Sequence, residues 1–182
     1  MATQYVPLET LTLIEGAELA HPTSLPELVY IEDPATHVMV DFQHEYPLVV
    51  DAHEMLTDLI KIIQGTHAHD VLVADHKNII GIVSIRDLRG IKPAHICETA
   101  NVSPAEITAQ MLMTPIADIV IISYEDLLHT RVGNIVSTLN IHKKNYALVV
   151  EYNTNTSEQI IRGMILTSKL SEQLGQHLGR LA

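Results

Sequence analysis

Apolar and polar residues follow two different periods along this chain. After Asp51 and Glu54, whose spacing is typical of a helix-capping box, apolar residues recur every three to four positions. This period predicts an amphipathic helix over residues 52–65. The short apolar run at 47–50, directly before the helix, predicts a strand.

Two further apolar runs predict a β-hairpin in the first half of the chain. Residues 70–75 and 78–84 are rich in branched apolar side chains, and only two residues separate them. The hydroxyl of Ser84 can cap the free amides of a helix that follows. The first half is therefore predicted to run strand, helix, strand, strand, helix.

The second half repeats this order of elements, which indicates an internal duplication in which Gly163 takes the place of Gly81. The elements predicted for it are a strand at 118–123, a helix at 124–140, paired strands at 145–151 and 159–166, and a last helix at 167–179. Both halves therefore have the same predicted architecture.

Prolines and capping residues mark the borders of these units. Five of the eight prolines fall within the first 47 residues, a spacing that excludes a long helix and predicts an extended arm with short strands or turns. Ser103, Pro104 and Glu106 open a predicted connecting helix that Pro115 closes. The chain is therefore divided into an N-terminal arm at 1–37, a first repeat at 38–98, a connecting helix at 99–115 and a second repeat at 116–182.

Composition and charge restrict the possible partners. The 182 residues are 47% hydrophobic and carry a formal net charge of −11, so a sizeable core is expected, and the average surface repels a nucleic-acid polymer. An anionic ligand needs a site with its own positive potential. No apolar run approaches the roughly 18 to 20 residues of a membrane span, and no secretory signal is recognisable. Since the single cysteine, Cys97, cannot form an internal disulfide, a cytoplasmic location is expected.

Two such units, joined by a segment that ends in MTP, resemble a tandem pair of CBS domains, also called a Bateman module. The resemblance covers residues 38–178, including the segments VLVADHKNIIGIVSIRDL and YALVVE followed by IRGMIL. It looks most like small stand-alone bacterial CBS-pair proteins. It implies an α+β fold of two tandem repeats packed about a pseudo-twofold axis, with an irregular N-terminal arm.

The resemblance also implies a nucleotide site. In CBS domains a Gly-apolar-x-Ser/Thr-x-x-Asp signature binds the ribose and phosphate of adenosine compounds, and its match here is Gly81, Ser84 and Asp87. A carboxylate can accept hydrogen bonds from two ribose hydroxyls, and a helix start attracts phosphate. Three cations lie near the same helix, namely Arg86, Arg89 and Lys92. Alternatively, Ser84 and Asp87 only cap the helix.

The adenine pocket of CBS pairs implies further contacts. It is usually built by the strand that begins the hairpin and by the segment that enters the first strand, which here suggests Asp70, Val71 and, less directly, Phe42. Phe42 could equally be a core residue or an anchor of the arm.

The second repeat departs from the signature. Leu166 stands where Ser84 does, and Lys169 stands where Asp87 does, so this half lacks the carboxylate that would hold a sugar. We expect one half-site to be competent and the other to be degenerate or specialised for a different anion. Lys169 and Arg162 could contact a phosphate there, or could be ordinary surface residues.

Two classes of function remain open from the sequence. The first is a regulatory sensor that binds AMP, ADP, ATP or S-adenosylmethionine between the repeats and changes conformation or dimer geometry, which an unknown effector protein reads. The alternative is a structural dimerisation module with a vestigial cleft. The first is favoured by the Ser84 and Asp87 pair, the second by Leu166 and Lys169. A homodimer is expected in both cases.

Catalysis and metal binding are not expected. Local sequence assembles no nucleophile with its base, and no glycine-rich phosphate loop is present. His67 and His69 could share an ion, because alternate residues face one way, but no carboxylate or cysteine cluster at ligand spacing completes a site.

Overall fold

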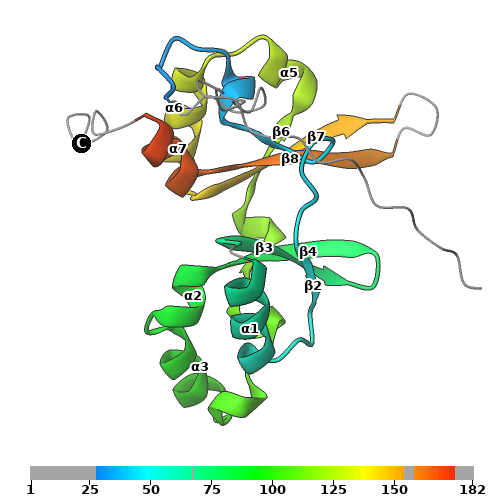
Figure 1. Cartoon of the computed structure of the whole chain (residues 1–182), viewed down its shortest axis with the longest axis vertical. Helices are drawn as coiled ribbons and strands as arrows, with labels where there is room; N and C mark the ends of the chain where they lie inside the picture. Colours follow the sequence, from blue (N-terminus) through cyan, green and yellow to red (C-terminus); the bar gives the residue numbers. More distant parts are fainter. Residues whose placement is uncertain (1–27, 67, 154–157, 175–182) are drawn as a thin grey trace, which may run out of the picture.

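The computed structural model describes residues 28–66, 68–153 and 158–174, which form two four-stranded sheets with helices on their outer faces (Figure 1). The predicted arm up to residue 27, His67, residues 154–157 and the predicted helix beyond residue 174 lie outside these residues. The α+β fold class with two similar units is confirmed.

The first sheet has the strand order β2-β3-β4-β5. β2 is parallel to β3, whereas β3 and β4 form the predicted antiparallel hairpin, with His76 in the left-handed region at its turn. The elements of this unit are β2 (Val49–Asp51), α1 (Leu56–Thr66), β3 (Asp70–Asp75), β4 (Asn78–Ser84), α2 (Ile85–Arg89), α3 (Lys92–Ala100), η2 (Pro104–Glu106), α4 (Ala109–Leu112) and β5 (Thr114–Pro115).

The second sheet has the order β1-β8-β7-β6 and the same mixture of one parallel and two antiparallel pairings. Its helices α5, α6 and α7 lie on the side away from the first sheet (Figure 1). The elements of this unit are η1 (Ala35–Val38), β1 (Val40–Asp41), η3 (Ile116–Asp118), β6 (Val120–Ser123), α5 (Tyr124–Leu128), α6 (Val132–His142), β7 (Tyr146–Tyr152), β8 (Gln159–Leu166) and α7 (Thr167–Gln173).

The two units exchange their short edge strands. β1 precedes the first unit in the chain but pairs with β8, where Asp41 lies opposite Gly163. β5 directly precedes the second repeat in the chain but pairs with β4 of the first sheet, where Pro115 lies opposite Gly81. The strand that precedes each repeat in the chain therefore completes the sheet of the other repeat.

Each sheet has two apolar faces because its strands alternate their side chains. One face packs under the helices of its own unit; in the first unit Leu59 and Ile63 of α1 cover Val71 and Val73. The other faces meet between the two sheets in a separate core, composed of Val40, Leu72, Ile82, Ile119, Leu148, Met164 and Leu166. The sheets are therefore packed face to face.

The first predicted helix begins later than expected, at Leu56 rather than residue 52. The predicted capping box at Asp51 and Glu54 is absent, since the Asp51 carboxylate accepts from the backbone N–H of His53 at 2.8 Å. The backbone here is instead bonded to the connecting segment, where Leu56 N–H donates to the Ile107 carbonyl at 2.9 Å. This pairing keeps residues 52–55 out of the helix.

The prediction of one connecting helix is wrong in its form. Ser103 and Glu106 do form a capping box, with Glu106 Oε2 accepting from Ser103 N–H at 2.8 Å, but it opens only the short η2. α4 and β5 follow η2, and α3, which was not predicted from the sequence, precedes it. The predicted helix at 124–140 is likewise two helices, because Thr130 and Val132 form backbone bonds with Ala35 and Asp33.

Candidate functional site

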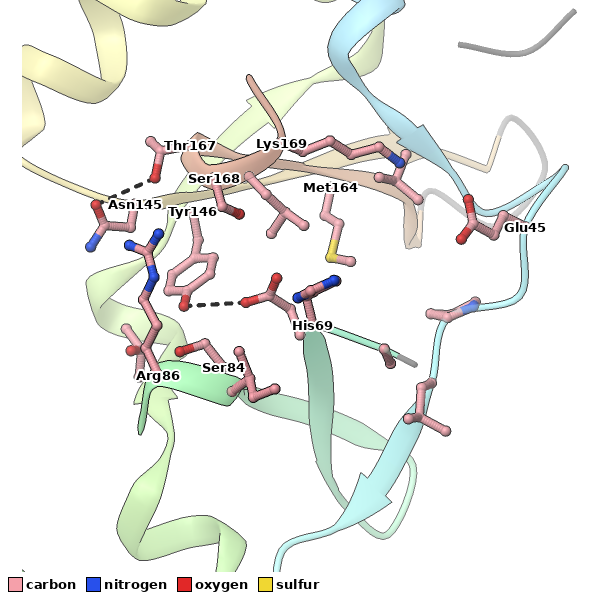
Figure 2. Close-up of a pocket in the computed structure, with 18 of the residues that line it drawn as sticks. Glu45, His69, Ser84, Arg86, Asn145, Tyr146, Met164, Thr167, Ser168 and Lys169 are labelled. Carbon is pink, nitrogen blue, oxygen red and sulfur yellow. Dashed lines mark hydrogen bonds between the residues drawn. The ribbon is translucent and has the colours of Figure 1, made fainter. Parts of the chain in front are cut away.

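A cavity of about 770 Å³ opens where the two sheets meet, at the start of β3 and β7 and the end of β4 and β8 (Figure 2). Asp70 in β3 and Tyr146 in β7 are equivalent positions of the two repeats, as the register of the two hairpins shows, and they face each other across the cavity. The lining residues are Val40, Phe42, Glu45, Tyr46, Pro47, Leu48, Thr66, Ala68, His69, Asp70, Ser84, Ile85, Arg86, Asp87, Thr114, Asn145, Tyr146, Met164, Leu166, Thr167, Ser168, Lys169 and Glu172.

Ser84 and Asp87 lie side by side in the wall of the cavity. Asp87 Oδ2 accepts from the Ser84 backbone N–H at 2.9 Å and from its hydroxyl at 3.0 Å, while Asp87 N–H donates to Ser84 Oγ at 3.2 Å. This is a complete capping box at the start of α2. Lys92 Nζ donates to Asp87 Oδ1 at 3.0 Å. The alternative reading, that the pair caps the helix, therefore describes the conformation seen here.

The hydrogen bonds to Ser84 and Lys92 do not occupy every acceptor site of the Asp87 carboxylate. Two carboxylate oxygens offer about four lone-pair sites, and among the described residues three hydrogen bonds use them. Asp87 remains part of the cavity lining, with 18% of its side chain exposed. It can therefore accept from a ligand hydroxyl without losing its role as a cap.

Asp70 and Tyr146 join the two repeats across the cavity, with the Tyr146 hydroxyl donating to Asp70 Oδ1 at 3.5 Å (Figure 2). Burial raises the pKa of Asp70, because a carboxylate loses hydration between the sheets. Burial also raises the pKa of Tyr146, to about 12, so its hydroxyl stays protonated at neutral pH. The hydrogen bond between the two side chains is long and weak, so a hydroxyl or amine of a ligand could take the place of the Tyr146 hydroxyl as its donor.

The structure brings together four of the six residues assigned from the sequence, Ser84, Arg86, Asp87 and Asp70, and Phe42 also lines the cavity. Gly81 and Val71, the other two, are not among the lining residues.

Gly81 and Val71 have packing environments instead. A Cβ at Gly81 would lie 2.6 Å from both Met113 Sδ and the Thr114 carbonyl oxygen, so the absence of a side chain allows β5 to approach β4. Val71 follows Asp70 along β3, and its side chain therefore points to the opposite face of the sheet, where it is buried under α1.

In the second repeat, Leu166, Thr167, Ser168 and Lys169 line the cavity, whereas Arg162 does not. The guanidinium of Arg162 is held by the Asp41 carboxylate, with Nε to Oδ1 at 2.9 Å and the second pair of atoms also at 2.9 Å. Of the two cations considered for this half, only Lys169 is placed to meet a ligand in the cavity.

Arg162 belongs to a structural cluster in which its guanidinium also donates to Glu151 and lies 4.5 Å from the centroid of the Tyr124 ring. The bidentate bond to Arg162 lowers the pKa of Asp41 to about 2. This cluster fixes β1 to β8.

The positive potential expected beside α2 is smaller than the sequence suggested. Of the three cations near that helix, only Arg86 lines the cavity, and Lys92 is paired with Asp87. With Lys169, two cations among the described residues line the cavity together with four carboxylates, which are those of Glu45, Asp70, Asp87 and Glu172.

Several lining residues were missed from the sequence. Tyr146 and Asn145 occupy in the second repeat the positions of Asp70 and His69 in the first, so a full alignment of the repeats would have found them. Tyr46, whose side chain is 98% exposed, and Glu45 precede the first sheet and had no motif to mark them.

Metal ligands do not gather at this site. No group of three or more histidine, cysteine, aspartate or glutamate side chains that could hold an ion occurs in the described part of the chain, and His67 lies outside it.

Within residues 28–66, 68–153 and 158–174, no helix is both long and apolar enough to cross a bilayer.

Comparison with known proteins identifies the fold. A hemolysin-like protein containing a CBS domain from Oenococcus oeni PSU matches with a TM-score of 0.54 at 19% identity, over 79% of this chain and 91% of that one. The CBS domain of a bacterial CNNM/CorC family Mg²⁺ transporter, in a complex with ATP, matches with a TM-score of 0.52 at 14% identity, over 78% and 87%.

Part of a larger enzyme has a similar fold. The GMP reductase variant C318A from Trypanosoma brucei matches with a TM-score of 0.50 at 13% identity, over 74% of this chain, which spans about a quarter (26%) of the length of that protein. No protein-family model matches the sequence, and no curated protein matches it. The similarities therefore show that this chain has the fold of a CBS-domain pair.

Proposed function

We propose that this chain is a regulatory module that binds an adenosine-containing ligand in the cavity between its two CBS-type repeats. The ligand is AMP, ADP, ATP or S-adenosylmethionine, held by Asp87, Ser84, Arg86 and Asp70. In this proposal the chain binds its ligand rather than converting it.

The observation that carries the proposal is that Asp87 and Ser84 lie in the wall of a cavity large enough for a nucleotide. A ribose hydroxyl can donate to the acceptor site of the Asp87 carboxylate that the three described hydrogen bonds leave unused. Phe42 and Met164 supply apolar surface for a base in the same cavity. The ATP complex of the CNNM/CorC domain shows that a protein of this fold accommodates an adenine nucleotide.

The mechanism follows from the position of the cavity between the repeats. A ligand that contacts Asp87 from the first repeat and Lys169 from the second binds only one relative arrangement of the two sheets well. It therefore shifts the population toward that arrangement. In a homodimer the change would reach a second chain and an effector protein.

One observation favours the structural alternative, in which the cavity is vestigial. The Asp87 carboxylate is already bonded to Ser84 and Lys92, so its presence is explained without a ligand. A module that only dimerises would keep these bonds and show no response to nucleotides.

The two functions differ in ligand-dependent stability. A ligand that binds only the folded state stabilises it by about 2.7 kcal/mol at one hundred times its dissociation constant. For a chain of this length that stabilisation raises the melting temperature by about 5 to 10 °C. We expect such a shift for wild-type protein with at least one of adenosine, AMP, ADP, ATP and S-adenosylmethionine. No shift with any of them at millimolar concentration contradicts the proposal.

A matched pair of variants separates binding from capping. Asp87→Ala and Glu106→Ala each remove the acid of a capping box, so each should lower the melting temperature of the ligand-free protein. Only Asp87 lines the cavity. We expect Asp87→Ala to abolish the ligand-induced shift and Glu106→Ala to preserve it, each measured against its own ligand-free melt.

A further inference from the structure

The charges that line the cavity restrict which adenosine compound it can hold, an inference that rests on the proposed function. Within the described part of the chain, four lining carboxylates, those of Glu45, Asp70, Asp87 and Glu172, outnumber the two lining cations. A polyphosphate brings three or four further negative charges into the same space. The cavity therefore suits a ligand with little negative charge of its own.

The lining cations are not grouped for a polyphosphate. In Figure 2, Arg86 lies at one end of the cavity beside Asn145, and the Lys169 amine lies at the other, on the side of Glu45, with Tyr146 between them. Neither forms an ion pair within the described ranges, so each can meet one anionic group. Each end thus offers a single positive charge.

Two of the lining carboxylates form no ion pair with the residues that the structure describes. Asp87 is paired with Lys92, and Asp70 accepts from Tyr146. Glu45 and Glu172 are exposed and make no ion pair with any described residue. Glu45 lies on the side of Lys169 (Figure 2), and Glu172 follows Lys169 by three residues on α7, so both glutamates would repel a phosphate chain at this end of the cavity.

We infer that the cavity selects adenosine compounds of low negative charge, namely the nucleoside, its monophosphate or a positively charged adenosyl compound, over ADP and ATP. Arg86 or Lys169 is sufficient for one phosphate. At either end, a second and third phosphate find no further lysine or arginine among the described lining residues, and at the Lys169 end they also meet Glu45 and Glu172.

The test is a calorimetric titration of the protein with adenosine, AMP, ADP, ATP and S-adenosylmethionine in turn. A chelator is present so that no divalent cation neutralises the phosphates. Two unit charges about 7 Å apart in water change an affinity about threefold. Because ATP carries about two more charges than AMP and meets two uncompensated glutamates, we expect it to bind at least about tenfold more weakly than AMP. Binding of ATP as tight as that of AMP would overturn the inference and leave the proposed function standing.

Charge-removing variants test the cause. Glu45→Gln and Glu172→Gln should each improve ATP affinity about threefold or more while changing that of adenosine by less than twofold. Glu98→Gln on α3 is the matched control, because Glu98 is exposed and does not line the cavity, and it should leave the ratio of ATP to adenosine affinity unchanged. Equal effects of all three variants would contradict a local origin of the selectivity. Absence of binding by every compound would instead overturn the proposed function itself, and this inference with it.

Discussion

At the scale of single residues, Asp87 has two tasks that use the same carboxylate. It caps α2 through Ser84 and is paired with Lys92, and in our proposal it also accepts from a ribose. The two tasks are compatible because capping holds the carboxylate in one orientation before a ligand arrives. A pre-oriented acceptor loses little side-chain entropy on binding. The same residue therefore contributes to stability and to recognition.

Asp41 and Arg162 provide a residue-scale prediction on pH. The pKa of Asp41 is lowered to about 2 from 3.8, so its contribution to stability is complete above about pH 4 and is lost as the pH falls toward 2. Asp41→Asn should lower the free energy of unfolding at pH 7 by about 1 to 2 kcal/mol, and the difference from wild type should shrink between pH 4 and pH 2.5. Urea unfolding at several pH values measures both effects.

The control for this prediction is the exposed pair of Asp58 and Lys61, whose side chains are 46% and 74% exposed. Asp58→Asn should cost less than about 0.5 kcal/mol, because solvent screens an exposed ion pair. If Asp41→Asn costs no more than Asp58→Asn at pH 7, the Asp41 pair is not structural.

At the scale of elements, two edge strands of two residues each connect the repeats. β1 and β5 are too short to be stable alone. Each lies opposite a glycine on the strand with which it pairs. At Gly163 a Cβ would collide with the Val40 carbonyl oxygen and meet the Met39 side chain at 3.0 Å. The glycines are therefore required by the close approach of a neighbouring strand.

Alanine at these glycines should separate the edge strands from their sheets. We expect Gly81→Ala and Gly163→Ala each to lower the free energy of unfolding by about 1 to 3 kcal/mol, because a backbone oxygen must move. Gly65→Ala in α1 is the control, since a Cβ there meets nothing within 4 Å, and it should stabilise the helix by about 0.5 to 1 kcal/mol. Chemical denaturation of the three variants measures the contrast; a neutral Gly81→Ala would contradict this role for β5.

At the scale of the whole molecule, duplication places equivalent positions of the two repeats around one cavity. Their side chains have diverged, so that Asp70 faces Tyr146 and Ser84 corresponds to Leu166. The cavity therefore has two unlike ends, one with Asp87 and one with Lys169. A ligand with two different ends suits such a cavity better than two copies of one ligand.

The homodimer expected from the sequence is a prediction at this scale. Light scattering coupled to size exclusion should report twice the 20.2 kDa mass of one chain at micromolar concentration. A dimer would transmit the ligand-induced change to a second pair of repeats. A mass of one chain under these conditions would contradict the prediction and leave ligand binding as a property of the monomer.

The sequence predicted the bounds of several strands but missed two helix boundaries. The strands β3, β4 and β8 have the predicted bounds because apolar alternation and turn residues are local signals. The start of α1 and the break at Thr130 were missed, since both depend on backbone bonds to segments far along the chain. The strands β1 and β5 carry too few residues for any periodic pattern.

The sequence by itself determined the α+β class and the Ser84 and Asp87 pair at the start of a helix, because these depend on neighbouring residues, and it determined the duplication because the same order of local elements occurs twice. Only the tertiary structure decided that β1 and β5 exchange between the sheets, that Arg162 pairs with Asp41 instead of facing the cavity, and that Glu45 and Glu172 line it. Those outcomes depend on which distant segments meet, and the free energy of such contacts is not encoded in any one stretch of the chain.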